Sequence, residues 1–578
     1  MVSNLFNTFF VSVADHIGTS RPLSSYENVN NILDEYENHE SILKIKAHSI
    51  SNGTFNFRPI SENDVSKLIQ DIKVKKATGF DGIPPKLLKA AKEELSIPLS
   101  NMINTSIMCS SFPDDLKCAE VSPIFKKQDN LIRNNYRPVS VLPVISKLFE
   151  RTYYNQMYDF FQVILSSYLA AFRQNYGCNH VLLKFVEDMK YALDQKEHFG
   201  AILMDLSKAF DCLPHPLLIC KLHAYGFSLK SCELICSYLS NRKQRVKVGG
   251  SKSDWCYMKK GVPQGSILGP LLFNVFINDI YYFLQNMCVL YNYADDNNIG
   301  YSHSDLDTLL HRLENCGSVA IKWFKSNDME ANPSKFQGLL SLYGNQRERA
   351  PEKITIANVE IPFSINVKLL GVTVDSNLSF DTHVSDICKK SSRYLRAISR
   401  VSKYLSTECR QYLYNAFVVS NFHYCNIVWH LCGTQNTIKI EKINRRALKI
   451  IFNDYRSSYI ELLDKADQPN LYTSRIHSIA LETYRSLKRL NPPFLHDCFT
   501  YQVENYELRN VSQLELPRVR TIKYGINSYR YQGAKIWNSL TLDIMCAESP
   551  KQMKSLLKDS DTNRCNCNTC DLCQIKRM

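Results

Sequence analysis

Two strand-like runs that end in aspartates, the first of them continuously apolar, constrain the fold of this chain most strongly. Residues 201–204 lead into Asp205, and residues 289–294 lead into the adjacent pair Asp295 and Asp296. A continuous apolar run is typical of a strand with both faces buried, and a carboxylate at its end is costly unless it binds a partner or a metal ion. We therefore expect both runs to be buried strands that present carboxylates at one edge of a sheet.

The second run predicts a strand, a tight turn and a second strand. Two aspartates lie at the tip, and Asn297 and Asn298 have the residue type that suits turn geometry. Like charges side by side repel, and a divalent cation would remove that penalty. If the strands ending at Asp205 and Asp295 are neighbours, three carboxylates converge, as two metal ions about 3.5–4 Å apart require. Either block alone also fits an ordinary Asp-Asp turn on the surface.

A third block lies between the other two. Gly261 to Gly269 contains Pro263-Gln264-Gly265, and an apolar run follows it. Glycine and proline force a defined turn, so the pattern predicts a turn followed by a buried helix. Gln264 could hydrogen-bond a nucleotide sugar or base, and Gly265 would let the backbone come close to a ligand. The ordinary start of a helix is the alternative.

Length and composition set wider limits. With 578 residues the chain is too long for one compact core, and 44% hydrophobic residues are too many for a disordered protein. Lys and Arg exceed Asp and Glu by 70 to 56, and the net charge of +14 suits a polyanionic partner such as nucleic acid. The 20 scattered cysteines indicate reduced thiols inside the cell, and no apolar window is long enough to predict a membrane span. Residues 9–13 resemble a short amphipathic packing segment.

The pattern divides the chain into regions. Residues 61–115 open with the N-cap signal Ser61 and a helical pattern, and residues 116–384 alternate strand-like and helical runs, which indicates an α+β fold. Residues 385–500 are helical, with two basic stretches that either contact nucleic acid or are simply solvated. The polar tail after residue 500 ends in four cysteines that fit either a tetrahedral zinc site or a thiol-rich flexible tail: Cys565, Cys567, Cys570 and Cys573.

Taken in order, the three blocks resemble motifs A, B and C of the reverse transcriptase palm. Asp205 with Phe210 matches motif A, the Pro-Gln-Gly turn matches motif B, and residues 293–296 match the Tyr-x-Asp-Asp box of motif C. Residues 121–140 resemble the fingers, and residues 323–337 resemble motif D. The particular residues of these blocks, together with residues 76–84 ahead of them, resemble those of jockey-type elements of the non-LTR (LINE-type) retrotransposons.

The resemblance implies a right-hand polymerase: fingers, a palm with an antiparallel sheet, a helical thumb, and a helical or irregular C-terminal tail. The regions implied are an N-terminal extension at 1–60, a pre-fingers segment at 61–115, the reverse transcriptase domain at 107–374, the thumb at 385–500 and the tail at 501–578. The implied activity is RNA-directed DNA polymerisation, with an RNA template, a DNA primer or target and dNTPs as partners. No membrane partner is expected, and the family's life cycle implies the nucleus and cytoplasm.

The same resemblance assigns roles to residues. Two Mg²⁺ ions, or Mn²⁺ in their place, would be held by Asp205, Asp295 and the Leu206 carbonyl. Asp296 would tune this site, and Lys335 would act as a general acid toward pyrophosphate; a solvated lysine after a turn is the alternative. An aromatic ring at Phe210 would exclude the 2′-hydroxyl of an rNTP. The nucleotide-binding residues expected are Lys126, Lys127, Arg137, Leu206, Phe210, Gln264 and Gly265.

Two further positions and two alternatives remain. Arg173 falls in a fingers motif without a defined contact, and residues 367–372 resemble the hairpin that holds the primer end. We find no endonuclease motif ahead of the polymerase blocks, which suggests a partial copy of an element. A catalytically inactive fragment that only binds RNA is one alternative. An RNA-templated RNA polymerase is another, and Phe210 disfavours it.

Overall fold

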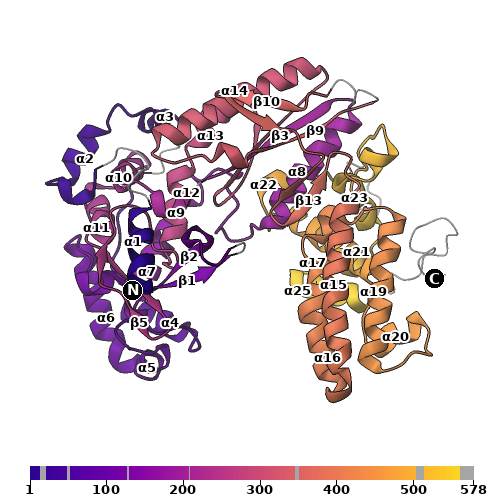
Figure 1. Ribbon diagram of the computed structural model, residues 1–578, viewed down its shortest axis with the longest axis horizontal. Coiled ribbons are helices and arrows are strands. Elements are labelled where there is room, and N and C mark those ends of the chain that lie inside the picture. The colour runs from indigo at the N-terminus through magenta and orange to yellow at the C-terminus, as the bar shows by residue number, and fades with distance from the viewer. Residues whose placement is uncertain are drawn as a thin grey trace.

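The computed structural model describes residues 1–13, 21–48, 53–126, 129–206, 208–344, 350–502 and 513–559. It has a mixed α/β fold with several sheets and many helices. In Figure 1 most helices of the first 280 residues and a five-stranded sheet lie on the left, whereas the helix at residues 178–194 and the helices after residue 381 lie toward the right. A four-stranded sheet with the long helix α14 lies between them at the top of the view.

The four-stranded sheet is antiparallel with strand order β7-β8-β3-β9. Both of its faces are buried: residues 202 and 204 of β3 belong to the core on the α14 side, whereas residues 201 and 203 belong to the core that contains α8. This two-sided burial explains why residues 201–204 are continuously apolar, and it confirms the predicted buried strand. The strands are β3 (His198–Asp205), β7 (Val289–Tyr293), β8 (Asp296–His303) and β9 (Gln337–Ser341).

A second sheet lies beside the N-terminus. In it β1 pairs antiparallel with β2 and parallel with β4, and β4 also pairs with the short strands β5 and β6. Helix α1 packs against β4 through Phe10, which forms a small core with Val121 and Val246. The strands are β1 (Cys118–Phe125), β2 (Tyr136–Val141), β4 (Lys243–Val248), β5 (Ser251–Lys252) and β6 (Cys256–Tyr257).

Helices of the first 335 residues surround these two sheets. The predicted N-cap at Ser61 is confirmed: its side chain accepts a hydrogen bond from the Asp64 amide, and the Asp64 carboxylate accepts one from the Ser61 amide, a complete capping box. The helices and helical turns are α1 (Val2–Ser12), η1 (Leu23–Ser25), α2 (Val29–Glu35), α3 (Glu40–His48), α4 (Glu62–Gln70), α5 (Pro85–Ala90), α6 (Lys92–Met108), η2 (Asp114–Lys117), η3 (Arg133–Asn135), α7 (Val144–Phe161), α8 (Cys178–Asp194), α9 (Ala209–Cys212), α10 (His215–Ala224), α11 (Leu229–Leu239), α12 (Gly269–Ile277), α13 (Ile280–Leu284), α14 (Leu306–Ser326) and η4 (Pro333–Lys335).

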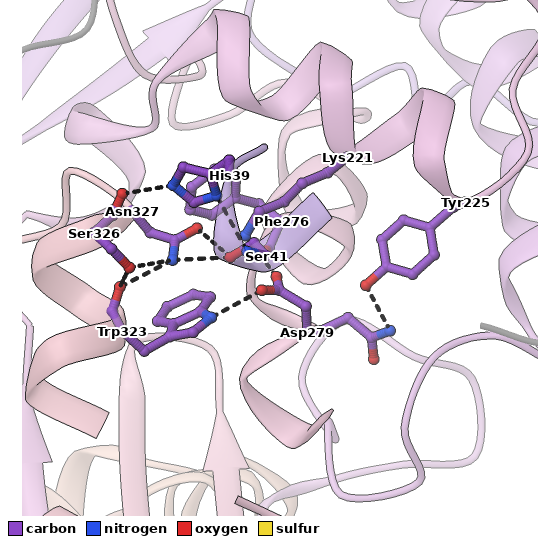
Figure 2. A network of polar contacts seen from close by, with 10 residues as sticks. His39, Ser41, Lys221, Tyr225, Phe276, Asp279, Trp323, Ser326 and Asn327 are labelled. Atoms are coloured by element: carbon purple, nitrogen blue, oxygen red, sulfur yellow. Dashed lines mark hydrogen bonds and ion pairs between the residues drawn. The ribbon is translucent and has the colours of Figure 1, made fainter. Parts of the chain in front are cut away.

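A buried ion pair joins α10 to Asp279 at the start of α13, and a hydrogen bond from Trp323 extends the contact to α14. Lys221 Nζ lies 2.5 Å from Asp279 Oδ1 and donates to the Phe276 carbonyl at 2.8 Å, and both charged side chains are 0% exposed. Trp323 Nε1 donates to the other carboxylate oxygen at 2.8 Å. Figure 2 shows these groups pointing toward one another, with Ser41 of α3 bonded to Asn327 beside them. The network ties three helices and the N-terminal segment to one another.

Two hairpins and a run of helices complete the chain. The hairpin expected at residues 367–372 is present as β12–β13, with a turn at Leu370 and Gly371. The two hairpins are β10 (Lys353–Ile356) with β11 (Val359–Pro362), and β12 (Asn366–Leu369) with β13 (Val372–Asp375). The helices and helical turns are α15 (Asp381–Val401), η6 (Ser402–Tyr404), α16 (Thr407–Tyr414), η7 (Asn415–Val419), α17 (Ser420–His423), α18 (Asn426–Trp429), α19 (Thr434–Phe452), α20 (Tyr459–Lys465), α21 (Leu471–Leu487), α22 (Pro493–His496), η8 (Ile522–Ile526), α23 (Tyr529–Asn538), α24 (Leu542–Met545) and α25 (Pro550–Asp559).

Residues 513–559 of the predicted helical or irregular tail are largely helical. Residues 513–559 form α23, α24 and α25, which build a core with α21 around Trp537. Glu187 of α8 accepts hydrogen bonds from the Tyr529 and Arg530 amides at the start of α23. Asp194 of the same helix accepts from the Thr521 amide and hydroxyl. Two carboxylates about 330 residues away in sequence therefore bind this region to α8, a contact that no local pattern reveals.

Within the described residues, no helix is both long and apolar enough to cross a membrane.

Candidate active site

The predicted aspartates lie together at the end of the four-stranded sheet. Asp205, the last residue of β3, is the antiparallel partner of Asp296, the first residue of β8. Tyr293 pairs with Asp296, so Ala294 and Asp295 form the two-residue turn between β7 and β8. Ala294 takes the positive φ of 56° that such hairpin turns require. The tip of the hairpin thus carries one aspartate in the turn and one at the strand edge.

The expected turn role of Asn297 and Asn298 is wrong. A two-residue turn ends at Asp295, so both asparagines belong to β8, where they are 1% and 2% exposed. Their side chains still serve the hairpin: Asn297 Nδ2 donates to the Asp295 carbonyl, and Asn298 Nδ2 donates to the Tyr291 carbonyl, both at 3.0 Å. The asparagines therefore brace the turn from inside the strand.

Burial and mutual repulsion act on the carboxylates. Burial, and after it the charge of Asp205, raises the pKa of Asp295. Burial together with the charges of Asp295 and Asp205 raises the pKa of Asp296 to about 6. Lys335 of η4 lies with its Nζ 2.7 Å from Asp205 Oδ2 and supplies the positive charge at this carboxylate. Burial and mutual repulsion thus disfavour the charged forms of Asp295 and Asp296, a penalty that a bound cation would offset.

An open cleft of about 1240 Å³ lies over these groups. It brings together predicted residues that are spread over more than 200 positions of the sequence. Asp296 is not among the residues that line it, which fits a supporting position behind Asp295. The predicted residues in its wall are Lys126, Arg137, Asp205, Leu206, Phe210, Gln264, Gly265, Asp295 and Lys335. Lys127 lies outside the described residues.

One wall of the cleft is basic. Lys126 follows β1, and its amide donates to the Asn135 carbonyl at 2.8 Å, which places it next to Arg137 of β2. Burial, and then the charge of Arg137, lowers the pKa of Lys126. Two cations held this close are poorly satisfied without an anion between them, and a guanidinium can bind phosphate with two hydrogen bonds.

The turn around Gln264 forms another part of the cleft lining and packs on β2. The Gln264 carbonyl accepts from the Ser140 amide at 2.8 Å, and its side-chain amide donates to Asp211 Oδ1 at 2.8 Å. Gly265 has a φ of +130°, and a Cβ there would lie 2.4 Å from the Ser140 carbonyl oxygen. The glycine is therefore required by its close approach to β2. Burial raises the pKa of Asp211 to about 6, and its hydrogen bond to Gln264 was not expected from the sequence.

Phe210 forms a rigid aromatic floor. Its ring stacks on Phe273 of α12 with 4.4 Å between ring centres, and Phe172 meets its face at 90° from 5.9 Å. Phe172 also lines the cleft and has a positive φ of 60°, an uncommon conformation for an aromatic residue. Arg173, by contrast, points away from the site. It is buried and donates to the Ser166 and Leu169 carbonyls, so its role is to hold the loop after α7.

The donors at the sheet edge fit a divalent cation. Asp205 and Asp295 both reach the cleft, and Mg²⁺ is commonly bound by one or two carboxylates together with water and substrate phosphates. Among the residues that the structure describes, no group of three acidic, histidine or cysteine side chains is close enough to hold a metal by itself. The zinc prediction at residues 565–573 falls outside the described residues.

An antiparallel sheet with aspartates at its edge, beneath a cleft lined by cations and aromatic rings, suits metal-assisted chemistry on a phosphate-bearing substrate. Residues 124–374 match the family model described as reverse transcriptase (RNA-dependent DNA polymerase). Residues 124–374 are thus similar to reverse transcriptase domains, and the curated relatives that the chain resembles are polymerases of transposons and other mobile elements. Reverse transcriptases generally use divalent metal ions and act on nucleic acid templates and primers.

Curated relatives agree with this assignment. The chain is 27% identical over 407 residues to the probable RNA-directed DNA polymerase from transposon BS of Drosophila melanogaster, covering 68% of this chain and 45% of the relative. It is 26% identical over 458 residues to the probable RNA-directed DNA polymerase from transposon X-element of the same species, covering 75% of this chain and 50% of that relative. It is 25% identical over 413 residues to the RNA-directed DNA polymerase from mobile element jockey of Drosophila funebris, covering 68% of this chain and 44% of that relative. The chain spans about half the length of these relatives.

Proposed function

We propose that this chain is the RNA-directed DNA polymerase of a jockey-like non-LTR retrotransposon. It adds dNTPs to the 3′-hydroxyl of a DNA primer along an RNA template. The observation that carries the proposal is that Asp205 and Asp295 line the same cleft as Lys126 and Arg137, with Asp296 paired to Asp205 at the strand edge. Nucleotidyl transfer requires carboxylates that bind metal ions and cations that bind the triphosphate. Both kinds of group must line the same cleft.

Metal ions would supply the charge that activates the primer hydroxyl and steadies the leaving pyrophosphate. Asp205, Asp295 and the Leu206 carbonyl are the proposed ligands for two Mg²⁺ ions, with Mn²⁺ as a substitute. Asp296 tunes the site from the strand edge. Lys126 and Arg137, with Lys127 as the predicted third cation, bind the triphosphate. Their positions beside Asp205 and Asp295 support these roles, because the triphosphate must span both groups.

Lys335 is proposed to protonate pyrophosphate as it leaves. Its ammonium now pairs with Asp205 at 2.7 Å and is more than half exposed. A cation bound by Asp205 would compete for that carboxylate, which leaves the Lys335 ammonium facing the cleft with a proton to donate. The pairing thus keeps the general acid within reach of the site.

Phe210 is proposed to select deoxyribose, and Gln264 with Gly265 to contact the nucleotide. The ring is held in place, because it stacks on Phe273 and also makes a T-shaped contact with Phe172. A rigid wall at this point would clash with a 2′-hydroxyl. The Asp211–Gln264 hydrogen bond supports a fixed orientation of the glutamine.

The regions follow from the same proposal. Residues 107–374 would act as fingers and palm, 61–115 as the segment ahead of the fingers, and 385–500 as the thumb, with 1–60 and 501–578 as extensions. The basic helices α15 and α19 would then face the nucleic acid duplex. The proposed locations are the nucleus and cytoplasm, as the life cycle of the family implies.

Primer extension on an RNA template tests the proposal. Purified full chain with Mg²⁺ is compared with Asp295→Asn/Asp296→Asn and with Asp307→Asn, an exposed acid at the start of α14 outside the cleft. We expect extension with dNTPs by the wild type and by Asp307→Asn, and none by the double variant. If folded wild type binds RNA but extends no primer, the chain is an inactive retroelement fragment, and RNA binding is its activity.

A further inference from the structure

The first helix of the chain reaches the cleft of the polymerase domain. Phe9, Phe10 and Val13 line the same cleft as Asp205 and Asp295. The family match begins only at residue 124, so this helix is outside the matched region. Figure 1 shows α1, in indigo, next to α9 and the strands β1 and β2, although α9 follows it by about 200 residues.

Two asparagines fix α1 in one position on the five-stranded sheet. Asn7 is 2% exposed, and its Nδ2 donates to the Asp254 carbonyl at 2.8 Å while its Oδ1 accepts from Gln244 Nε2 at 3.2 Å. Asn4 Oδ1 accepts from the Asp254 amide at 3.2 Å. A buried amide that uses both ends specifies one register, since a shift by one residue would leave its polar atoms unpaired.

The apolar face of α1 reinforces this placement. The Phe10 ring is buried against Val121 and Val246, and the Phe6 ring meets Tyr136 edge-on at 4.9 Å between centres. Terminal segments usually fray unless they are held by such contacts. The residues that follow on the helix are therefore presented to the cleft by a fixed support.

The Phe9 ring makes a cation–π contact with Lys208. The Lys208 ammonium lies 4.2 Å from the centre of the Phe9 ring, and the Arg133 guanidinium lies 5.3 Å from it. Lys208 is in the left-handed region with φ +49°, which costs free energy for a residue with a side chain. It lies between Asp205 and Phe210 in the sequence and lines the cleft. A strained backbone and an aromatic partner together fix this ammonium at the edge of the cleft.

We propose that Phe9 is a positioning residue that holds the Lys208 ammonium for the triphosphate of the incoming nucleotide, which makes α1 part of the nucleotide site. The proposal rests on the polymerase function proposed above. Lys208 lies on the same cleft as Lys126 and Arg137, so it adds a third described cation to the basic wall. The ring attracts the ammonium without neutralising it, unlike a carboxylate, so its charge stays available to phosphate.

Substitutions at Phe9 separate this role from simple packing. Phe9→Leu keeps an apolar side chain but removes the ring face, and Phe9→Tyr keeps the ring. Leu5→Ala, on an exposed part of the same helix, controls for general loosening of α1. Primer extension gives KM for dNTP and kcat, and thermal melting of each variant reports folding.

We expect Phe9→Leu to raise the KM for dNTP about tenfold with kcat within twofold, in line with the strength of cation–π contacts. Phe9→Tyr restores the wild-type KM, and Leu5→Ala does not change it. Lys208→Met raises KM similarly, and Phe9→Leu/Lys208→Met is no worse than Lys208→Met alone, because the two residues act as one unit.

Three results would overturn the proposal: an unchanged KM in Phe9→Leu, additive effects in the double variant, or a fall in kcat and melting temperature that Phe9→Tyr does not rescue. The wild type is measured first. If it extends no primer, the polymerase function fails and this proposal fails with it. If it extends normally and only the Phe9 results disagree, the polymerase function stands and the role of Phe9 alone is refuted.

Discussion

Replacing Lys221 by methionine tests the buried network that joins α10 to α14. Lys221 and Asp279 are both 0% exposed, and the ammonium makes a 2.5 Å ion pair and a 2.8 Å hydrogen bond to the Phe276 carbonyl. Methionine fills much of the same space but leaves the Asp279 carboxylate buried with only the Trp323 indole N–H as donor. Removing one partner of a buried pair costs about 3–5 kcal/mol, a large part of the roughly 5–15 kcal/mol that stabilises a domain.

An exposed ion pair between α14 and α3 supplies the control. Lys322 of α14 lies 2.9 Å from Glu40 of α3, but both side chains are more than half exposed. Lys322→Met should therefore cost at most about 1 kcal/mol. The double variant Lys221→Met/Asp279→Asn should recover most of the loss, because asparagine accepts the Trp323 hydrogen bond without a charge. Urea unfolding followed by tryptophan fluorescence measures all four proteins.

The reasoning is refuted if the midpoint of Lys221→Met shifts no further than that of Lys322→Met. It also predicts a pH dependence. Burial lowers the pKa of Lys221 from 10.5 to about 8, against the opposing charge of Asp279. Between these values the unfolded chain binds a proton that the folded chain does not, so the contribution of Lys221 to stability rises with pH from about 8 to 10.5. The wild type, compared with Lys221→Met, should become relatively more stable over that interval.

Four further outcomes follow from the site and the C-terminal region. Gly265→Ala, whose Cβ would lie 2.4 Å from the Ser140 carbonyl, should cost roughly 1–3 kcal/mol and raise the KM for dNTP, whereas Gly250→Ala, with open space around it, should do neither in the same melting and extension assays. Asp296→Asn should abolish extension yet raise the melting temperature at pH 8; the gain should shrink as pH falls through about 6, where the wild-type carboxyl becomes protonated, and a lowered midpoint at pH 8 would contradict this. Phe210→Ala should reduce the preference for dNTP over rNTP by about a hundredfold in competition extension, and unchanged rNTP exclusion would remove the ring from that role. Glu187→Gln should expose α23 to faster hydrogen exchange without altering the cleft, since it weakens the charged acceptor of the Tyr529 amide by roughly 1–2 kcal/mol; equal protection in both proteins would disprove the docking role.

Local sequence determined the elements that carry the candidate site. The apolar run before Asp205 forms a strand whose two faces are both buried. The Tyr293–Asp296 block forms the turn of a hairpin between two strands. The Pro-Gln-Gly turn leads into α12 as expected. These features depend on neighbouring residues, so the order of residue types was sufficient to predict them.

Where a pattern allowed two solutions, the tertiary structure decided between them. Asn297 has a residue type common in turns, yet strand pairing places it inside β8, because the two-residue turn is complete at Asp295. Arg173 lies in a motif near the site, yet its guanidinium serves three nearby backbone carbonyls. The turn propensity of a residue, or its place in a motif, has less influence on its final position than strand hydrogen bonds and the need of buried polar groups for hydrogen-bond partners.

The sequence by itself determined the chemistry of this protein: which carboxylates, cations and aromatic ring are present, and that strands end at the aspartates. Only the tertiary structure decided that Lys335 pairs with Asp205, that Asp211 holds Gln264, that α8 anchors the helices after residue 513, and that Phe9 lies over Lys208. The physical reason is separation along the chain. Contacts between residues tens to hundreds of positions apart depend on how whole elements pack, and no local spacing records that packing.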